Sequence, residues 1–201
     1  MARRAYLVTG GAGFVGANLC RRLVEQGEEV HVFARETTDL WRLEGIRDRL
    51  HLHEVDIRDA ARVTEAVEDI RPAVIYHLAT HGAYHYQRDA DTILLVNVFG
   101  FWNLVNACDR VGYELFVNAG SSSEYGRKEF AMRETDILEP DSYYAVAKSA
   151  QSLLARLCSR MTDRPIVTLR LFSVYGPWEE PTRLIPRLMM AAIERGEDPA
   201  Q

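Results

Sequence analysis

The stretch TGGAGFVG, residues 9–16, decides the fold of this chain. It joins an apolar, β-rich run at residues 5–9 to a segment of helical periodicity at residues 13–26. Its glycines carry the spacing GxGxxG at Gly11, Gly13 and Gly16, and GxxGxxG when Gly10 is counted instead of Gly11. A loop of this kind lets backbone N–H groups and the positive end of the helix dipole face a pyrophosphate. The stretch predicts a dinucleotide-binding unit, and a purely structural glycine turn is the alternative.

Apolar runs and helical segments alternate along the rest of the chain, which is the pattern of βαβ units. We predict six strands, at residues 5–9, 29–34, 50–55, 73–78, 114–119 and 166–171, and five helices, at residues 13–26, 59–70, 88–111, 141–161 and 183–195. Asp59 is the expected N-cap of the second helix. The sequence therefore predicts one α/β domain with a doubly wound parallel sheet. The loops at residues 80–87, 120–140 and 172–182 follow the carboxyl ends of strands, where ligands bind in such sheets.

Composition limits the classes of partner. The 24 basic and 29 acidic side chains give a net charge of −5 and are interspersed, so we expect no nucleic-acid binding. The uncharged apolar runs are shorter than the roughly 20 residues of a membrane span, and the first residues lack the apolar core of a secretory signal. We therefore expect a cytoplasmic protein with no membrane partner. The three cysteines are widely spaced and predicted to be plain buried thiols.

Two positions bear on the kind of dinucleotide. Arg35 ends the second predicted strand, about 20 residues after the glycine loop, where an arginine can receive a 2′-phosphate. Arg35 therefore favours NADP slightly over NAD. The alternative is that Glu36 binds the adenosine ribose of NAD and Arg35 is a solvated loop cation. Asp56, at the end of the third strand, is placed to reach the adenine, and its alternative is a capping or turn role.

Tyr144 and Lys148 lie four residues apart in a predicted helix, so their side chains share one face. A fixed cation close to a phenol lowers its pKa from about 10, which allows acid–base work near neutral pH. Neighbouring Tyr143 has only Ala147 at the same spacing. Three serines, at residues 121–123, follow the fifth strand. Alone they predict a turn, but with the glycine loop and the YxxxK pair they predict a hydroxyl beside Tyr144.

Five stretches occur in a characteristic order: TGGAGFVG, HLA at residues 77–79, GSSSEYG at 120–126, YAVAK at 144–148 and LRLFSVYGP at 169–177. Together they resemble the extended short-chain dehydrogenase/reductase family, and more narrowly its NAD(P)-dependent nucleotide-sugar epimerase/dehydratase branch. The resemblance runs over essentially the whole chain. It implies a Rossmann fold that holds a nicotinamide cofactor, NAD or NADP.

The resemblance also implies residue roles. Tyr144 would be the acid/base, Lys148 would hold the ribose and tune Tyr144, and Ser121 would bind the sugar oxygen. The other cofactor contacts it implies, together with those expected from the residues, are Gly10, Gly13, Phe14, Val15, Gly16, Arg35, Asp56, Ile57, Leu78, Ala79, Thr80, Asn97 and Phe172. The expected substrate contacts are His81, Ser122, Ser173 and Arg183. No metal ligand is expected.

Departures from the family pattern narrow the reaction. The 4,6-dehydratases of the family carry acidic residues directly after the catalytic hydroxyl, where this chain has Ser122 and Ser123, so dehydration is disfavoured. Ser173 stands where family members often have an asparagine for the substrate diphosphate. The segment RLIPRL, residues 183–188, resembles the substrate loop of 4-ketoreductases and epimerases. We expect hydride transfer at a ring carbon, C4, of a nucleotide-linked sugar, with epimerase and ketoreductase both open.

Two further expectations follow from the resemblance. Family members continue into a small carboxyl-terminal substrate domain, so we expect this chain to hold the Rossmann domain and only the start of the substrate-binding region, at about residues 172–201. The resemblance also implies a homodimer, in which the helices at residues 88–111 and 141–161 pack against those of the second copy. A non-catalytic dinucleotide-binding module is the alternative to an enzyme.

Overall fold

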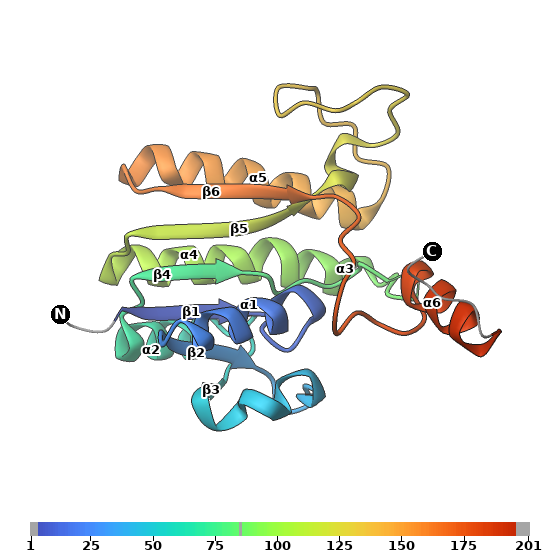
Figure 1. Ribbon diagram of the computed structural model, residues 1–201. Helices are drawn as coiled ribbons and strands as arrows, with labels where there is room; N and C mark the ends of the chain where they lie inside the picture. Colours follow the sequence, from blue (N-terminus) through green and yellow to red (C-terminus); the bar gives the residue numbers. More distant parts are fainter. Residues whose placement is uncertain (1–3, 85, 196–201) are drawn as a thin grey trace.

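A six-stranded parallel sheet forms the centre of the computed structural model, which describes residues 4–84 and 86–195 (Figure 1). Its strands are β1 (Ala5–Thr9), β2 (Glu29–Ala34), β3 (His51–Glu54), β4 (Val74–His77), β5 (Leu115–Ser121) and β6 (Ile166–Leu171). The strand order is β3-β2-β1-β4-β5-β6. The winding direction reverses between β1 and β4, and in such sheets the crevice at the carboxyl end of this switch point receives the ligand. The predicted Rossmann-type sheet is confirmed.

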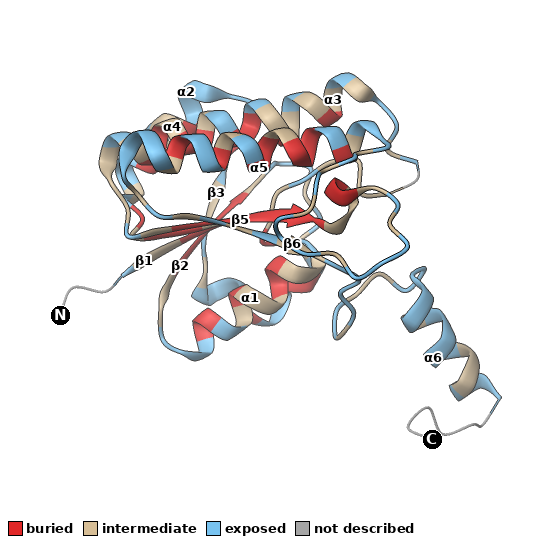
Figure 2. Ribbon diagram, turned by 90° about the horizontal axis from the view of Figure 1, so that it is seen from above, coloured by how far each residue is buried: buried red, intermediate tan, exposed pale blue. Residues whose placement is uncertain are grey.

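Helices cover both faces of the sheet (Figure 2). One face carries α1 (Phe14–Glu25) and the 3-10 helix η1 (Trp41–Arg49), and the other carries α2 (Ala60–Ile70), α4 (Gly100–Val111) and α5 (Tyr143–Thr162). Successive strand residues point to opposite faces. Val8 accordingly packs with Leu23 of α1, whereas Leu7 belongs to the core that contains Val63 of α2 and Leu104 of α4. The central strands β1, β4 and β5 are largely buried on both sides, whereas the edge strand β6 exposes Val167 and Leu169 on one face.

The expected boundaries hold for all six strands within two residues. Asp59 caps α2 as predicted, because its carboxylate accepts hydrogen bonds from the backbone N–H groups of Ala61 and Arg62. The three cysteines are buried and free. Two short elements were not expected, namely η1 and the 3-10 turn η3 (Ser122–Tyr125). Neither carries the long apolar period by which α-helices are identified.

The predicted helix at residues 88–111 is divided into three parts. It consists of α3 (Ala90–Leu94), a π-helical turn η2 (Leu95–Phe99) and α4. By length and composition, the stretch Ala90–Val111 is the one helix among the described residues that could cross a membrane. Here it packs against α2 and α5 beside the sheet, as a core helix does.

The carboxyl-terminal part of the domain is the least buried. After β6, the chain runs across the carboxyl edge of the sheet to α6 (Leu184–Glu194), which stands away from the layers (Figures 1 and 2). None of the residues in α6 is buried. The expected substrate region at residues 172–201 falls here, and its last six residues lie outside the described ones.

Candidate functional site

A cleft of about 400 Å³ lies at the carboxyl ends of β1, β2 and β4, at the switch point of the sheet. Most of the predicted cofactor and substrate contacts line it. They are Gly10, Gly13, Phe14, Val15, Gly16, Arg35, Asp56, Ile57, Leu78, Ala79, Thr80, His81 and Arg183. Sequence reasoning thus located this wall of the site because these residues follow strand ends.

The glycine loop is shaped for a close approach of backbone to ligand. Gly10 has φ +70°, and a Cβ there would lie 2.6 Å from the backbone nitrogen of Ala79. A Cβ on Gly16 would lie 2.2 Å from the carbonyl oxygen of Gly10. Gly13 caps α1 without a side-chain hydrogen bond, and the first turn of α1 holds no acidic residue. The first-turn N–H groups and the helix dipole are therefore left for an anion, which fits the pyrophosphate of a dinucleotide.

Charged side chains line the cleft at the carboxyl ends of β2 and β3. Arg35 is exposed at the end of β2 and lines the cleft, and Glu36 is not among the lining residues. Asp56 pairs with Arg58, whose Nη2 lies 2.6 Å from Asp56 Oδ2. The hydrogen bond from Arg58 lowers the pKa of Asp56. Arg58 and Asp39 also line the cleft and were missed from the sequence, although both follow strand ends.

Asn97 does not line the cleft, contrary to the expectation. It is fully buried in the π-helical turn, where its Oδ1 accepts hydrogen bonds from Thr80 Oγ1 at 2.9 Å and from the His81 N–H at 3.0 Å. Its Nδ2 donates to the His81 carbonyl at 2.7 Å. Asn97 therefore fixes the backbone of the loop that forms the cleft wall. The resemblance implied a cofactor contact for Asn97, but the π-helical turn directs its side chain to the backbone of this loop instead.

The predicted serine and tyrosine are brought together. Ser121 and Thr80 lie near enough to the Tyr144 hydroxyl that each lowers its pKa, and Thr80 is also a lining residue of the cleft. Ser121 is the last residue of β5 and caps η3, with its Oγ accepting the N–H of Ser123 at 3.1 Å. The end of β5 and the start of α5 thus place two hydroxyls beside the cleft.

The net shift of the Tyr144 pKa is opposite to the one expected from a neighbouring cation, and Lys148 is not among its causes. Burial raises the pKa of Tyr144 above its ordinary value, and this effect outweighs the hydrogen bonds from Ser121 and Thr80. Lys148 is itself buried, and its Nζ donates to the Ala119 carbonyl at 2.9 Å and to Gln151 Oε1 at 3.0 Å. Burial lowers the pKa of Lys148 to about 8. The Lys148 ammonium group is therefore held by the Ala119 carbonyl and Gln151. Tyr144, whose pKa is raised by burial, is a neutral phenol at neutral pH.

The ion pair between Glu124 and Arg170 fixes the backbone of Ser121. Glu124 Oε1 accepts the backbone N–H of Ser121 at 2.7 Å, and Glu124 Oε2 accepts from Arg170 Nε at 2.9 Å. Arg170 also donates to the Tyr125 hydroxyl at 3.0 Å. The Glu124 side chain is fully buried. Sequence reasoning missed this role because Glu124 and Arg170 lie on different elements, η3 and β6.

Three predicted contacts lie away from the cleft lining. Ser122 opens η3, Ser173 is exposed in the loop after β6, and the exposed Phe172 ring lies 6.3 Å from the Tyr125 ring. For Phe172 and Ser173 the physical reason is that β6 is the edge strand beyond β5, so its carboxyl end is two strands away from β4. Arg183, later in the same segment, does reach the cleft and stacks on Tyr84 at 4.8 Å from the ring centre.

Comparison with known proteins identifies the family. The model of the NAD dependent epimerase/dehydratase family matches residues 6–200. A probable UDP-glucuronate 4-epimerase of Rhizobium meliloti is 29% identical over 88% of this chain and 55% of its own length. A probable dTDP-glucose 4,6-dehydratase of Sinorhizobium fredii is 30% identical over 94% of this chain and 59% of its own. The solved UDP-glucose 4-epimerase of Thermus thermophilus, a complex with NAD, aligns with a TM-score of 0.83 and 29% identity, covering 96% of this chain and 63% of that one.

The chain therefore belongs to the NAD dependent epimerase/dehydratase family. The resemblance found in the sequence is confirmed, and so is the relation to nucleotide-sugar enzymes. The chain spans less than two thirds of the length of these relatives. Both epimerases and dehydratases are among them, so similarity alone does not separate the two reactions.

Proposed function

We propose that this chain binds a nicotinamide dinucleotide in the cleft and that its site transfers hydride at C4 of a nucleotide-linked sugar. The observation that carries the proposal is the position of Thr80, which lines the cleft and lies near enough to the Tyr144 hydroxyl to lower its pKa. A phenol so placed lies next to both the cofactor and whatever the cofactor reduces or oxidises. The glycine cradle and the family membership support the same assignment.

The roles of the residues follow from this geometry. The nicotinamide, when bound, would be the hydride acceptor or donor. Tyr144 gives a proton to the oxygen on C4 when the carbon accepts hydride, and takes it back in the reverse direction. Ser121 hydrogen-bonds the same oxygen. Because burial keeps Tyr144 a neutral phenol, the free site is prepared for the reductive direction. Lys148 would hold the nicotinamide ribose once its ammonium turns from Ala119 and Gln151.

The residues that directly follow Ser121 argue against a dehydratase, because none of them offers a free carboxylate. Elimination at C5 and C6 needs an acid and a base that face the sugar, and Ser122 and Ser123 occupy the adjoining positions. Glu124 follows them, but both of its carboxylate oxygens are occupied by Ser121 and Arg170 in the interior. We therefore favour an epimerase or a 4-ketoreductase. Arg35 favours NADP slightly over NAD, because it is exposed in the cleft.

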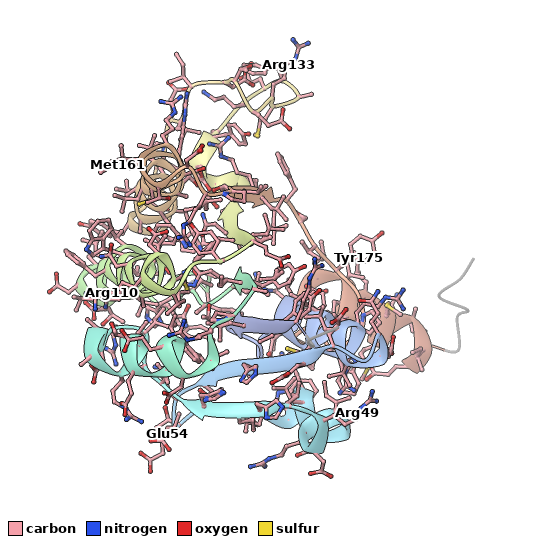
Figure 3. All side chains as sticks on the ribbon, turned by 90° about the vertical axis from the view of Figure 1, so that its left-hand side faces the viewer. Arg49, Glu54, Arg110, Arg133, Met161 and Tyr175 are labelled. Atoms are coloured by element: carbon pink, nitrogen blue, oxygen red, sulfur yellow. The ribbon has the colours of Figure 1, made fainter. Side chains whose placement is uncertain are left out.

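The outer helical surface supports a homodimer as the assembly. Large apolar side chains are exposed on η2 and α4 and on α5, namely Leu95, Phe99, Trp102, Leu153, Leu157 and Met161. Figure 3 shows Arg110 and Met161, which mark α4 and α5, on neighbouring parts of one side of the molecule. Two such helix pairs packed together would form a four-helix bundle and cover these side chains. Cytoplasmic location and the lack of nucleic-acid and membrane partners stay predictions.

The test measures cofactor binding and hydride transfer separately. The purified chain is titrated calorimetrically with NAD and with NADPH, and saturable binding is expected. Conversion of UDP-glucose, UDP-glucuronate or dTDP-glucose to its 4-epimer is then followed by chromatography, because an epimerase returns its hydride and leaves no net nicotinamide reduction. NADPH oxidation by a 4-keto sugar nucleotide, followed by absorbance, tests the reductase. The same assay uses this chain extended by the carboxyl-terminal part of the Thermus thermophilus relative, which supplies the length that the chain does not cover.

Matched tyrosine variants assign the acid. In the extended chain, Tyr144→Phe is expected to lower turnover by roughly 10²- to 10⁴-fold with little effect on cofactor affinity. Tyr143→Phe is the control, because Tyr143 is exposed on the neighbouring face of α5. Equal loss in both variants would refute the role of Tyr144. Cofactor binding without any hydride transfer in either form would instead favour the non-catalytic module.

A further inference from the structure

A cluster of three histidines and one glutamate lies on the β2 and β3 side of the sheet. Glu29 and His31 belong to β2, and His51 and His53 belong to β3. His31 and His51 are direct partners in the parallel ladder. Alternate residues of a strand share a face, so Glu29 and His31 lie on the same side as Phe33, which packs in the core with α2.

The side chains of the cluster converge. His31 Nε2 lies 3.2 Å from Glu29 Oε1, and His31 Nδ1 lies 2.9 Å from His53 Nε2. The His31 ring is stacked 4.7 Å from that of His51. One ligand atom from each of Glu29, His31 and His51 lies within 4.8 Å of the other two. Two ligands of a tetrahedral zinc ion are about 3.3 Å apart, since each bond is about 2.0–2.1 Å. The His31 and Glu29 atoms already have this separation.

The surroundings offer access and negative charge. A recess of about 500 Å³ adjoins the cluster and is lined by Glu29 and His51 together with Glu28, Asp48 and Arg49. His31 is buried, whereas His51 is exposed, so its side chain is not held by the core. Three carboxylates face one arginine in this recess. The Arg49 guanidinium donates to the Val24 carbonyl, which holds it at the rim.

We propose that Glu29, His31 and His51 form a binding site for a borderline divalent cation of the zinc class. Imidazole and carboxylate together suit such ions, whereas Mg²⁺ and Ca²⁺ prefer oxygen ligands alone. His53 acts as a positioning residue: it accepts the Nδ1–H of His31 and so directs Nε2 of His31 toward the metal. Water completes the four ligands.

The site is separate from the dinucleotide cleft and has a structural consequence. Glu29 is the first residue of β2 and His51 the first of β3, so the cluster begins at the amino ends of strands whose carboxyl ends face the cleft. β3 is an edge strand, joined to the sheet through β2 alone. A bound cation would link β3 to β2. It would therefore raise the temperature of unfolding without contacting the cofactor.

The experiment titrates the untagged chain with Zn²⁺ calorimetrically and with Co²⁺ by visible absorbance. We expect one ion per chain, a tetrahedral Co²⁺ spectrum and a higher Tm in the presence of Zn²⁺. His51→Gln and Glu29→Gln are each expected to weaken Zn²⁺ binding at least tenfold, and His53→Phe to weaken it and alter the Co²⁺ spectrum. Glu54→Gln is the matched control, because the exposed Glu54 side chain lies on β3 but on the opposite face (Figure 3).

Two results would overturn the proposal. One is the absence of saturable Zn²⁺ binding at free concentrations up to about 100 µM, where a site with a Kd of about 1 µM, or about 8 kcal/mol, would be saturated. The other is binding that His51→Gln and Glu29→Gln leave unchanged while their far-ultraviolet circular dichroism shows a folded chain. Equal binding of Mg²⁺ would refute the assignment to the zinc class.

Discussion

Replacing Gly16 with alanine tests whether the glycine loop is a cofactor cradle. The new Cβ would lie 2.2 Å from the Gly10 carbonyl oxygen and 2.7 Å from Gly11 Cα, both of which are backbone atoms. Ordinary contact begins at 3.4 Å, so α1 and the loop must separate by about 1.2 Å. Alanine in a helix gains up to about 1 kcal/mol over glycine, but overpacking of this kind costs typically about 1–3 kcal/mol. We therefore expect a net loss of stability.

The same displacement moves the N–H groups that would bind the pyrophosphate. A shift of about 1 Å in a positioned group can cost up to 10²-fold in function, so NAD affinity is expected to fall at least tenfold by calorimetry. In a domain of this size, Tm changes by roughly 2–4 °C for each kcal/mol. Gly45→Ala is the matched control, because a Cβ on Gly45 meets only the end of the Arg21 side chain at 3.5 Å. Unchanged NAD affinity and Tm in Gly16→Ala would refute the cradle.

Three further predictions concern charge, pH and assembly. Arg35→Ala should reduce NADPH affinity roughly 10- to 150-fold and leave NADH affinity unchanged, since it removes a charge-assisted contact; equal affinities in the parent chain would remove the NADP preference. Burial lowers the pKa of His77 to about 3, whereas the unfolded state binds a proton near pH 6.5, so stability present above pH 6.5 should fall by about 1.4 kcal/mol per pH unit between pH 6.5 and 3. Denaturant unfolding at several pH values should show a shallower decline in His77→Asn. Leu153→Asp, at a side chain that is 59% exposed, should convert a dimer into a folded monomer in sedimentation experiments, and a monomeric parent chain would contradict the bundle.

The sequence predicted the sheet and most of the cleft for a common physical reason. Strand ends and a glycine loop are local signals, and in a parallel sheet all carboxyl ends meet at one edge. Gly13, Ala79 and Asp56 could therefore be placed in one cleft without knowledge of their contacts. The pairing of Ser121 with Tyr144 followed likewise, because β5 and α5 are consecutive elements around the same edge.

The misplaced residues depend on packing between elements, which local patterns do not encode. Asn97 has helical spacing in the sequence, but a π-helical turn directs it into the interior against Thr80 and His81. Lys148 has the right spacing to approach Tyr144, yet its ammonium is taken by the Ala119 carbonyl of the adjoining strand. The pKa of Tyr144 depends on burial, so the i,i+4 rule identified the pair but not the direction of the shift.

The distribution of exposed apolar side chains separates the two halves of the proposed site. The proposed cofactor contacts, apart from Phe172, come from residues up to Lys148. Those that line the cleft lie at the edge of a sheet whose two faces pack in a buried core. The segment that would meet the sugar exposes Phe172, Val174 and Tyr175 after β6 and Leu184 and Leu188 on α6. Side chains of this size are stable in an interior or an interface rather than in water. A surface of this kind is where the additional length of the relatives would pack. We therefore expect this domain to bind the cofactor by itself, and we expect binding of the proposed sugar substrate to depend on a partner surface that covers α6 and the loop before it.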